Sequence, residues 1–199
     1  MEEILSRLKE EINRLLQTGR QVLIAIDGNC TAGKTTLAAA LEKEYSCNVF
    51  HMDDFFLRPE QRTAARYTEP GGNVDYERFR EEVLIPLQQE CAFSYRPFSC
   101  SSFTLSSPVQ IQPKQLNIVE GTYSQHPYFG DIYDWKIFLT VNETLQHQRI
   151  LRRPAFLHQR FFESWIPMEH HYFDFYQIPN RCNLFLDLSE QEINCVDPM

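Results

Sequence analysis

The stretch 22–36, VLIAIDGNCTAGKTT, constrains the fold of this chain more than any other. It begins with an apolar, β-prone run, Val22 to Ile26, continues through a loop bounded by Gly28 and Gly33, and ends in residues that favour helix. The loop fits GxxxxGK(S/T), a pattern that is typical of a phosphate-binding P-loop when it stands between a strand and a helix. The stretch therefore predicts the strand–loop–helix core of an α/β domain that binds phosphate.

Each fixed position of the loop has a physical reason. Gly28 and Gly33 allow backbone conformations and close approaches that a Cβ would block, so successive N–H groups can turn inward and hold an anion. The helix that begins near Gly33 adds unpaired N–H groups and the positive end of its dipole. Lys34 can reach the β and γ phosphates of ATP, and the Thr35 hydroxyl can bind Mg²⁺. The residues expected to contact the nucleotide are Gly28, Asn29, Cys30, Thr31, Ala32, Gly33, Lys34, Thr35 and Thr36.

Length and composition indicate one globular unit. The chain has 199 residues, 43% of them hydrophobic, which is enough to bury a full core, and we expect residues 1–199 to form a single domain. No apolar run approaches about 18 residues, so no membrane-spanning helix is predicted. The first residues, MEEILSRLKEEINRLL, are charged and periodic, unlike the apolar centre of a secretory signal. These features predict a cytoplasmic protein without a membrane partner.

Net charge and cysteine content limit the kinds of ligand that the chain is expected to bind. A formal net charge of −8 disfavours nucleic acid as a partner, because a polyanion requires a basic face. The six cysteines form no CxxC pair and show no zinc-site spacing, so we interpret them as buried or surface thiols. Cys30 differs from the others, since alkylation of a thiol inside the loop would block the phosphate site. The sequence leaves a homo-oligomer open.

Strands and helices alternate along the rest of the chain. Residues 2–17 carry an apolar stripe at helical spacing and predict a packing helix within 1–18, whose mixed charges disfavour binding to a membrane surface. Asp75 is expected to cap a helix from Tyr76 to about Gln89. Residues 92–113 predict a β-hairpin that forms a flap beside the sheet. Further buried strands are predicted at 47–52, 116–119, 135–141 and 183–188.

These elements predict the P-loop NTPase fold, a five-stranded parallel sheet flanked by helices, with a small β-hairpin flap and a helical lid. Ligands bind such open sheets at the carboxyl ends of the strands. Asp53 and Asp54 follow the second predicted strand, and Glu120 follows the next buried strand. An acidic residue after a buried strand is the Walker-B arrangement, in which a carboxylate orients Mg²⁺ and its waters.

Arginines gather in the predicted lid, residues 149–166. Arg149, Arg152, Arg153 and Arg160 lie within a dozen residues. The planar, permanently charged guanidinium suits phosphate oxygens. A solvated helix face is the alternative, but a P-loop in a chain of this negative net charge favours phosphate clamping. The six histidines are scattered without metal-ligand spacing, and we interpret each as structural.

The ordered set of motifs resembles that of the uridine kinase family of P-loop kinases, which includes nicotinamide riboside kinases and is related to phosphoribulokinase and bacterial pantothenate kinase. The resemblance extends over about residues 20–188. It rests on GNCTAGKTT in the loop, HMDDFF at 51–56, EPGGNVDYERF from Glu69, VEGTYS at 119–124 and RILRR from Arg149. This set is far more specific than the P-loop alone.

The resemblance implies an ATP-dependent, Mg²⁺-using kinase and gives roles to individual residues. Asp53 matches the carboxylate that accepts the proton of the attacking hydroxyl and faces Mg²⁺. Glu120 matches the acidic residue near the metal, Thr35 the Mg²⁺ ligand and Lys34 the phosphate clamp. The lid arginines that would span both substrates are Arg149 and Arg153.

The acceptor site departs from the uridine kinase pattern. Uridine kinases carry an acidic residue followed by His-Pro in the loop that grips the ribose, whereas this chain has Glu69, Pro70, Gly71 and Gly72. The residues expected to line the acceptor site are Asp53, Phe56, Glu69 and Tyr123. The predicted reaction transfers the γ-phosphoryl of ATP to a hydroxyl of a small molecule, such as uridine or a related riboside. A kinase for a non-nucleoside alcohol and a nucleotide-binding regulatory relative without turnover stay open, while the lack of an NKxD motif disfavours a GTPase switch.

Overall fold

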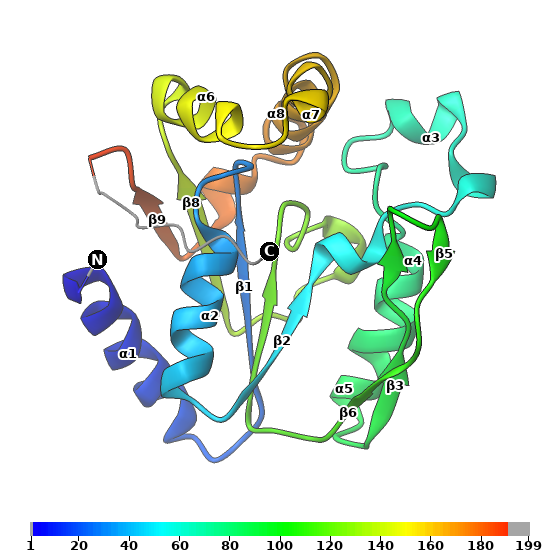
Figure 1. Ribbon diagram of the computed structural model, residues 1–199. Coiled ribbons are helices and arrows are strands. Elements are labelled where there is room, and N and C mark those ends of the chain that lie inside the picture. The colour runs from blue at the N-terminus through cyan, green and yellow to red at the C-terminus, as the bar shows by residue number, and fades with distance from the viewer. Residues whose placement is uncertain (1, 191–199) are drawn as a thin grey trace.

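Five parallel strands form the central sheet of the computed structural model, which describes residues 2–190 (Figure 1). The strands are β1 (Val22–Gly28), β2 (Cys47–His51), β7 (Leu116–Glu120), β8 (Trp135–Thr140) and β9 (Leu184–Asp187). Their order across the sheet is β2-β7-β1-β8-β9, with every pair parallel. The predicted five-stranded parallel sheet is confirmed, and the strand that leads into the P-loop lies at its centre.

The sheet is buried on both faces, because alternate side chains of each strand enter two separate cores. On β1, Ile24 belongs to one core and Leu23 to the other. Helices α1 (Glu2–Leu16) and α2 (Lys34–Glu44) pack on the first core, as the apolar stripe of the N-terminal helix predicts. Helix α8 (Ile166–Tyr176) packs on the second core. This two-sided burial explains why the strands appear in the sequence as continuous apolar runs.

The helix expected after Asp75 is present and begins with the predicted cap. The Asp75 Oδ1 accepts the N–H of Arg78 at 3.2 Å. The helix consists of α4 (Tyr76–Phe79), a π-helical turn (Arg80–Leu84) and α5 (Ile85–Gln88). Pro86 lies in α5 and has no N–H for an i→i−4 hydrogen bond, which is consistent with the wider turn before it.

The flap predicted at 92–113 is a long hairpin in two parts. The paired strands are β3 (Phe93–Tyr95) with β6 (Val109–Ile111), and β4 (Phe98–Ser99) with β5 (Thr104–Leu105). Pro97 and Pro108 stand between the two parts. Proline cannot donate to a strand ladder, so the pairing is interrupted at this point.

Residues 57–75 are rich in Pro, Gly and Arg, a composition that predicts a loop, but the structure differs from this expectation. It contains a 3₁₀ turn (Pro59–Gln61) and a short helix, α3 (Ala64–Thr68). Thr63 caps α3, because its side-chain oxygen accepts the N–H of Arg66 at 3.1 Å. The high content of Pro, Gly and Arg masked this cap in the sequence.

The helical lid expected at 149–166 lies within a longer helical segment above the carboxyl ends of the strands (Figure 1). Its parts are α6 (Glu143–Leu151), α7 (Ala155–Arg160), a π-helical turn (Phe161–Trp165) and α8. We call residues 143–176 the lid segment. Single 3₁₀ turns elsewhere span Met52–Phe55, Pro127–Phe129 and Ile178–Arg181. Within residues 2–190, no helix is both long and apolar enough to cross a membrane.

Candidate active site

The P-loop leaves the carboxyl end of β1 and leads directly into α2, as predicted. Its first glycine is held against the neighbouring strand. A Cβ on Gly28 would lie 1.9 Å from the carbonyl oxygen of Leu139, and the Gly28 φ is +140°. Only glycine satisfies both conditions. Thr31 and Gly33 also have positive φ angles, 61° and 103°, so the loop turns back on itself before the helix starts.

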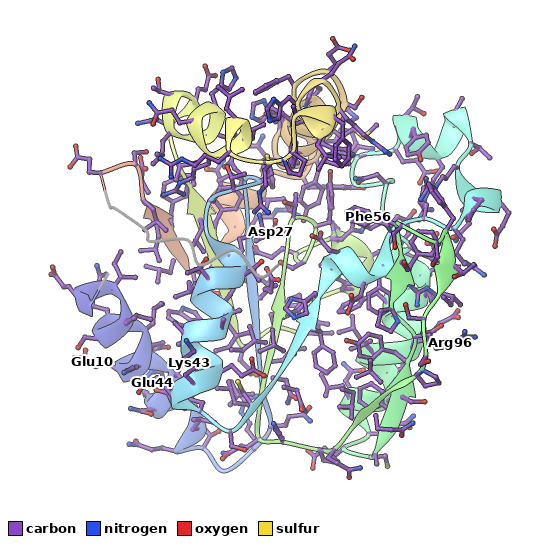
Figure 2. All side chains as sticks on the ribbon, in the orientation of Figure 1. Glu10, Asp27, Lys43, Glu44, Phe56 and Arg96 are labelled. Carbon is purple, nitrogen blue, oxygen red and sulfur yellow. The ribbon has the colours of Figure 1, made fainter. Side chains whose placement is uncertain are left out.

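A buried carboxylate, Asp27, fixes the start of the loop from below. Its oxygens accept the N–H groups of Gly28 at 2.7 Å, Tyr123 at 3.2 Å and Gln125 at 3.0 Å, and the hydroxyl of Tyr172 at 2.9 Å. Burial raises the pKa of Asp27 to about 6, although these hydrogen bonds act in the opposite direction. Figure 2 shows Asp27 at the end of β1, beneath the lid segment. The sequence reasoning missed Asp27, whose only signal is an acidic residue that ends an apolar strand.

Lys34 points into the centre of the loop. Its Nζ donates to the carbonyl oxygens of Gly28 and Asn29, both at 2.8 Å, and to the Thr122 hydroxyl at 3.1 Å. The side chain is buried, so this ammonium is the cation that an incoming phosphate would meet. Phosphate oxygens could take the place of the two carbonyl acceptors.

Carboxylates gather next to Lys34 at the ends of β2 and β7. Glu120 is buried, and its Oε1 accepts the Thr35 hydroxyl at 3.1 Å and lies 2.5 Å from Nδ1 of His51. The hydrogen bond to Glu120 raises the pKa of His51, a residue that the sequence indicated as structural. Solvent reaches Asp53, yet the surrounding protein atoms remove much of its hydration. This desolvation, followed by the charge of Glu120, raises the pKa of Asp53.

The predicted Mg²⁺ ligands Thr35, Asp53 and Glu120 fit a magnesium ion by chemistry and by charge. Their donors are hydroxyl and carboxylate oxygens, and the carboxylates of Asp53 and Glu120 repel each other without a cation between them. Within residues 2–190, no three His, Cys, Asp or Glu side chains form a metal cluster. Magnesium bound together with phosphate and water needs only one or two carboxylates, so the three residues suit that mode.

The lid segment contacts the backbone of the P-loop from above. The Glu169 Oε2 accepts the N–H of Cys30 at 2.9 Å, and the Gln146 amide donates to the Cys30 carbonyl at 3.3 Å. Arg149 donates from Nη1 to the carbonyl of Thr31 at 2.8 Å. The structure therefore brings the predicted Arg149 to the loop. Glu169 and Gln146 were missed, because neither belongs to a recognisable motif.

The other predicted lid arginine, Arg153, lies exposed beyond the end of α6. The five cysteines within residues 2–190 are free thiols, as interpreted from the sequence, and Cys195 lies outside the described residues. Burial, and then the nearby Glu169, raise the pKa of Cys30. The thiolate that alkylation requires is therefore disfavoured at this position.

The predicted acceptor-site residues occupy different environments. Phe56, which is labelled in Figure 2, is half-buried, and its backbone forms an isolated antiparallel bridge with Val74. Glu69 is exposed and accepts the hydroxyl of Tyr76 at 3.1 Å. Tyr123, in contrast, is only 3% exposed and packs edge-on against Tyr172 in the core, with ring centroids 4.9 Å apart. Phe56 and Glu69 are thus the more accessible of these three side chains.

Arg66 holds the loop that carries Glu69. Its guanidinium forms a two-pronged ion pair with Glu77, at 2.7 and 2.6 Å, and donates to the carbonyls of Gly72 at 2.9 Å and Val74 at 3.0 Å. It also lies 3.9 Å from the centre of the Tyr76 ring. These contacts fix the EPGG turn without a regular element of secondary structure.

Solved structures share this arrangement of elements. A possible uridine kinase from Bacillus stearothermophilus aligns at a TM-score of 0.64 and 21% identity, over 91% of this chain and 100% of its own. A candidate fructose transport system kinase from Silicibacter sp. TM1040 aligns at 0.63 and 21% identity, over 84% and 90%. The YGR205w protein aligns at 0.59 and 15% identity, over 93% of both chains. The fold is that of the P-loop kinases. Neither a protein-family model nor a curated protein sequence matches the chain.

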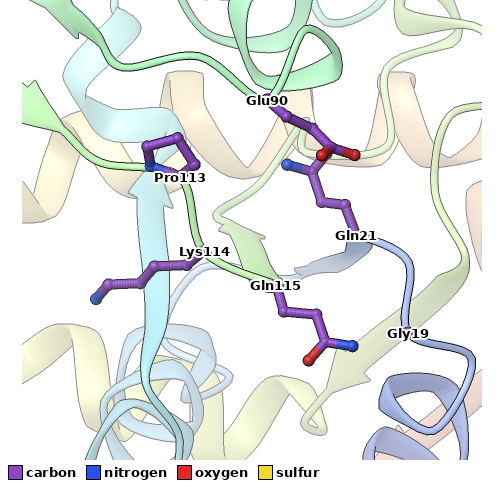
Figure 3. Close-up of a pocket in the computed structure, with 6 residues that line it drawn as sticks. All are labelled: Gly19, Gln21, Glu90, Pro113, Lys114 and Gln115. Carbon is purple, nitrogen blue, oxygen red and sulfur yellow. The ribbon is translucent and has the colours of Figure 1, made fainter.

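In a P-loop kinase fold, ligands belong at the carboxyl edge of the sheet. A shallow hollow lies at the opposite edge, where β1 and β7 begin (Figure 3). It is lined by Gly19, Gln21, Glu90, Pro113, Lys114 and Gln115. None of the residues that face the P-loop takes part in it, so it is separate from the candidate active site.

Proposed function

We propose that this chain is a small-molecule kinase that transfers the γ-phosphoryl group of ATP to a hydroxyl group, with a nucleoside such as uridine or a related riboside as the first acceptor class. The observation that carries the proposal is the convergence of Lys34, Thr35, Glu120 and Asp53 at one edge of the sheet. The likeness in fold to P-loop kinases supports it. The riboside class rests on the resemblance of the motifs to those of uridine kinases.

On the donor side, the inward N–H groups of the P-loop and Lys34 would bind the phosphates. Lys34 would exchange its carbonyl acceptors for oxygens of the β and γ phosphates. Thr35, Glu120 and Asp53 would hold Mg²⁺, which supplies neutralisation of phosphate charge when bound. Most of the catalysis in such a site comes from position and electrostatics.

On the acceptor side, Asp53 would orient the hydroxyl and accept its proton. Desolvation, the largest cause of its raised pKa, makes its carboxylate a better base than that of a fully hydrated aspartate. The acceptor oxygen then forms a bond to the γ-phosphorus, the bond between this phosphorus and the bridging oxygen breaks, and ADP leaves with that oxygen. Arg149 and Arg153 would stabilise charge on the transferred group as the lid segment closes and excludes water.

The test is ADP release from MgATP with a panel of acceptors: uridine, cytidine, nicotinamide riboside, pantothenate and several sugars. Strong stimulation by one riboside is the expected result. Stimulation by pantothenate or a sugar alone would replace the riboside with a non-nucleoside alcohol. Binding of MgATP with no stimulation by any acceptor would favour a regulatory nucleotide-binding protein instead.

A further inference from the structure

The Asp53 carboxylate is oriented by the backbone of the turn that carries it. Among the described residues 2–190, no group donates a hydrogen bond to this carboxylate. Asp53 belongs to the 3₁₀ turn Met52–Phe55, which follows directly after β2. A general base must lie within hydrogen-bonding reach of the proton that it accepts. The groups that hold this turn therefore decide where the proposed base points.

Arg78, on α4, holds the turn by two contacts. Its side chain is buried, and its Nη2 donates to the carbonyl oxygen of Asp54 at 2.9 Å. The carbon at the centre of the guanidinium also lies 4.2 Å from the centre of the Phe55 ring. One side chain thus fixes the two residues that follow Asp53, the first by its carbonyl group and the second by its ring.

The same guanidinium binds the flap. Its Nη1 donates at 2.8 Å to the carbonyl oxygen of Arg96, which lies between β3 and β4, and at 3.1 Å to Oε2 of Glu82. Glu82 in turn accepts the N–H of Arg96 at 3.4 Å, so both backbone groups of this flap residue are held. Arg78 therefore joins the turn that carries Asp53 to the flap.

Arginine suits this bridge because its planar fork points several N–H groups in fixed directions, whereas the lysine ammonium is a compact point charge. The flap makes a second contact with the turn, in which the Tyr95 hydroxyl donates to the Asp54 carboxylate at 3.1 Å. That contact involves the side chain of Asp54, while Arg78 binds its backbone. The two contacts can be tested separately, since Asp54→Asn retains the carbonyl group.

We propose that Arg78 is a positioning residue for phosphoryl transfer. By holding the Asp54 carbonyl against the flap, it fixes the direction in which Asp53 faces the acceptor hydroxyl. None of the contacts of Arg78 described above involves the P-loop, so MgATP should bind without it. This inference rests on the proposed function, in which Asp53 accepts the proton of the acceptor.

The experiment is a double-mutant cycle between Arg78→Lys and Asp53→Asn. The readout is kcat for ADP release with saturating MgATP and the acceptor of the panel above that stimulates the wild type most. Each rate is divided by the number of MgATP-binding sites that calorimetry measures, so that unfolded protein does not count as lost kcat. The matched control is Arg66→Lys, because Arg66 also binds two carbonyl groups, a glutamate and an aromatic ring, but at the EPGG turn.

Arg78→Lys alone is expected to lower kcat by about 10- to 100-fold, as a displacement of about 1 Å in a reacting group does, with the affinity for MgATP unchanged. In the Asp53→Asn background the same substitution should cause little further loss, because the group that Arg78 positions is already absent. Arg66→Lys should have the same effect on kcat in both backgrounds.

Unchanged kcat in Arg78→Lys, or an equal loss with and without Asp53→Asn, would overturn the inference. Arg78→Met, which retains the packing on Phe55 but lacks the donors, is the second variant if lysine disturbs the fold. Loss of MgATP binding in both Arg78 variants would also overturn it, because Arg78 would then support the fold as a whole. A wild type that binds MgATP and responds to no acceptor would instead refute the proposed function, and this inference with it.

Discussion

Replacement of Gly28 by alanine tests whether the close approach of β1 to β8 dictates the shape of the P-loop. A Cβ at this position would lie 1.9 Å from the carbonyl oxygen of Leu139 and 2.8 Å from its carbonyl carbon. These atoms belong to the backbone of a central strand and cannot rotate away. The φ of +140° is in addition a conformation that an alanine rarely adopts.

The expected loss of stability is the sum of three effects. Backbone strain at such a φ costs about 1–3 kcal/mol. Separation of the strands to relieve the contact resembles an overpacked core and costs about 1–3 kcal/mol. The same movement breaks the hydrogen bond from the Asn29 N–H to the Leu139 carbonyl, 3.2 Å long, at a cost of about 1 kcal/mol. We therefore expect Gly28→Ala to lower the free energy of unfolding by about 3–7 kcal/mol, a large part of a typical domain's stability.

Gly19→Ala is the matched control. Gly19 also has a positive φ, +73°, but a Cβ there would have no neighbour within 4 Å. This variant isolates the backbone cost, about 1–2 kcal/mol. Urea unfolding followed by circular dichroism measures both variants against the wild type. If Gly28→Ala and Gly19→Ala lower the free energy of unfolding equally, the contact with Leu139 is not the reason for glycine at position 28. The steric argument is then refuted.

Three further substitutions test the candidate site and its supports. Asp53→Asn should lower acceptor-dependent ADP release by at least about 100-fold while MgATP still binds. The control variant, Asp54→Asn, should retain turnover. Near-full activity of Asp53→Asn would remove this residue from the mechanism. Lys34→Ala should weaken MgATP binding itself, measured by calorimetry, and unchanged affinity would contradict its assigned role. Arg66→Ala removes the ion pair and the carbonyl contacts that hold the EPGG turn, so we expect the free energy of unfolding to fall by about 2–4 kcal/mol. Arg14→Ala, which removes an exposed pair on α1, should leave the unfolding midpoint unchanged, and equal effects would refute the role of Arg66.

The sheet could be predicted because its strands are buried on both faces. A strand of this kind, such as Val22–Gly28, has an apolar side chain at nearly every position and stands out between polar loops. The cap at Asp75 could also be predicted, because a short acidic side chain directly before an amphipathic helix commonly accepts a backbone N–H of the first helical turn. The short helix at 64–68 was not visible, because its stability depends on the contacts that Arg66 makes with residues further along the chain.

The placement of four candidate residues at one edge of the sheet could be predicted for a different reason. Lys34, Thr35, Asp53 and Glu120 each follow directly from a strand end or from the loop motif, and parallel strands bring their carboxyl ends together. Asp27 was overlooked because three of its four hydrogen bonds come from residues that lie about a hundred or more positions away in the sequence. The fourth comes from its neighbour, Gly28. The distant partners become neighbours only after the strands pair.

The loop motif could not predict the contacts between the lid segment and the P-loop, because these contacts involve the backbone of the loop. Glu169, Gln146 and Arg149 all bind peptide N–H or carbonyl groups of the loop. Every residue type except proline offers both of these backbone groups, so the contacts demand no particular side chain at Cys30 or Thr31. The pattern GxxxxGK(S/T) records only what phosphate binding requires of the loop. Specificity of the lid contacts must therefore lie in the lid residues themselves, and substitutions there are expected to alter phosphate binding although the motif stays intact.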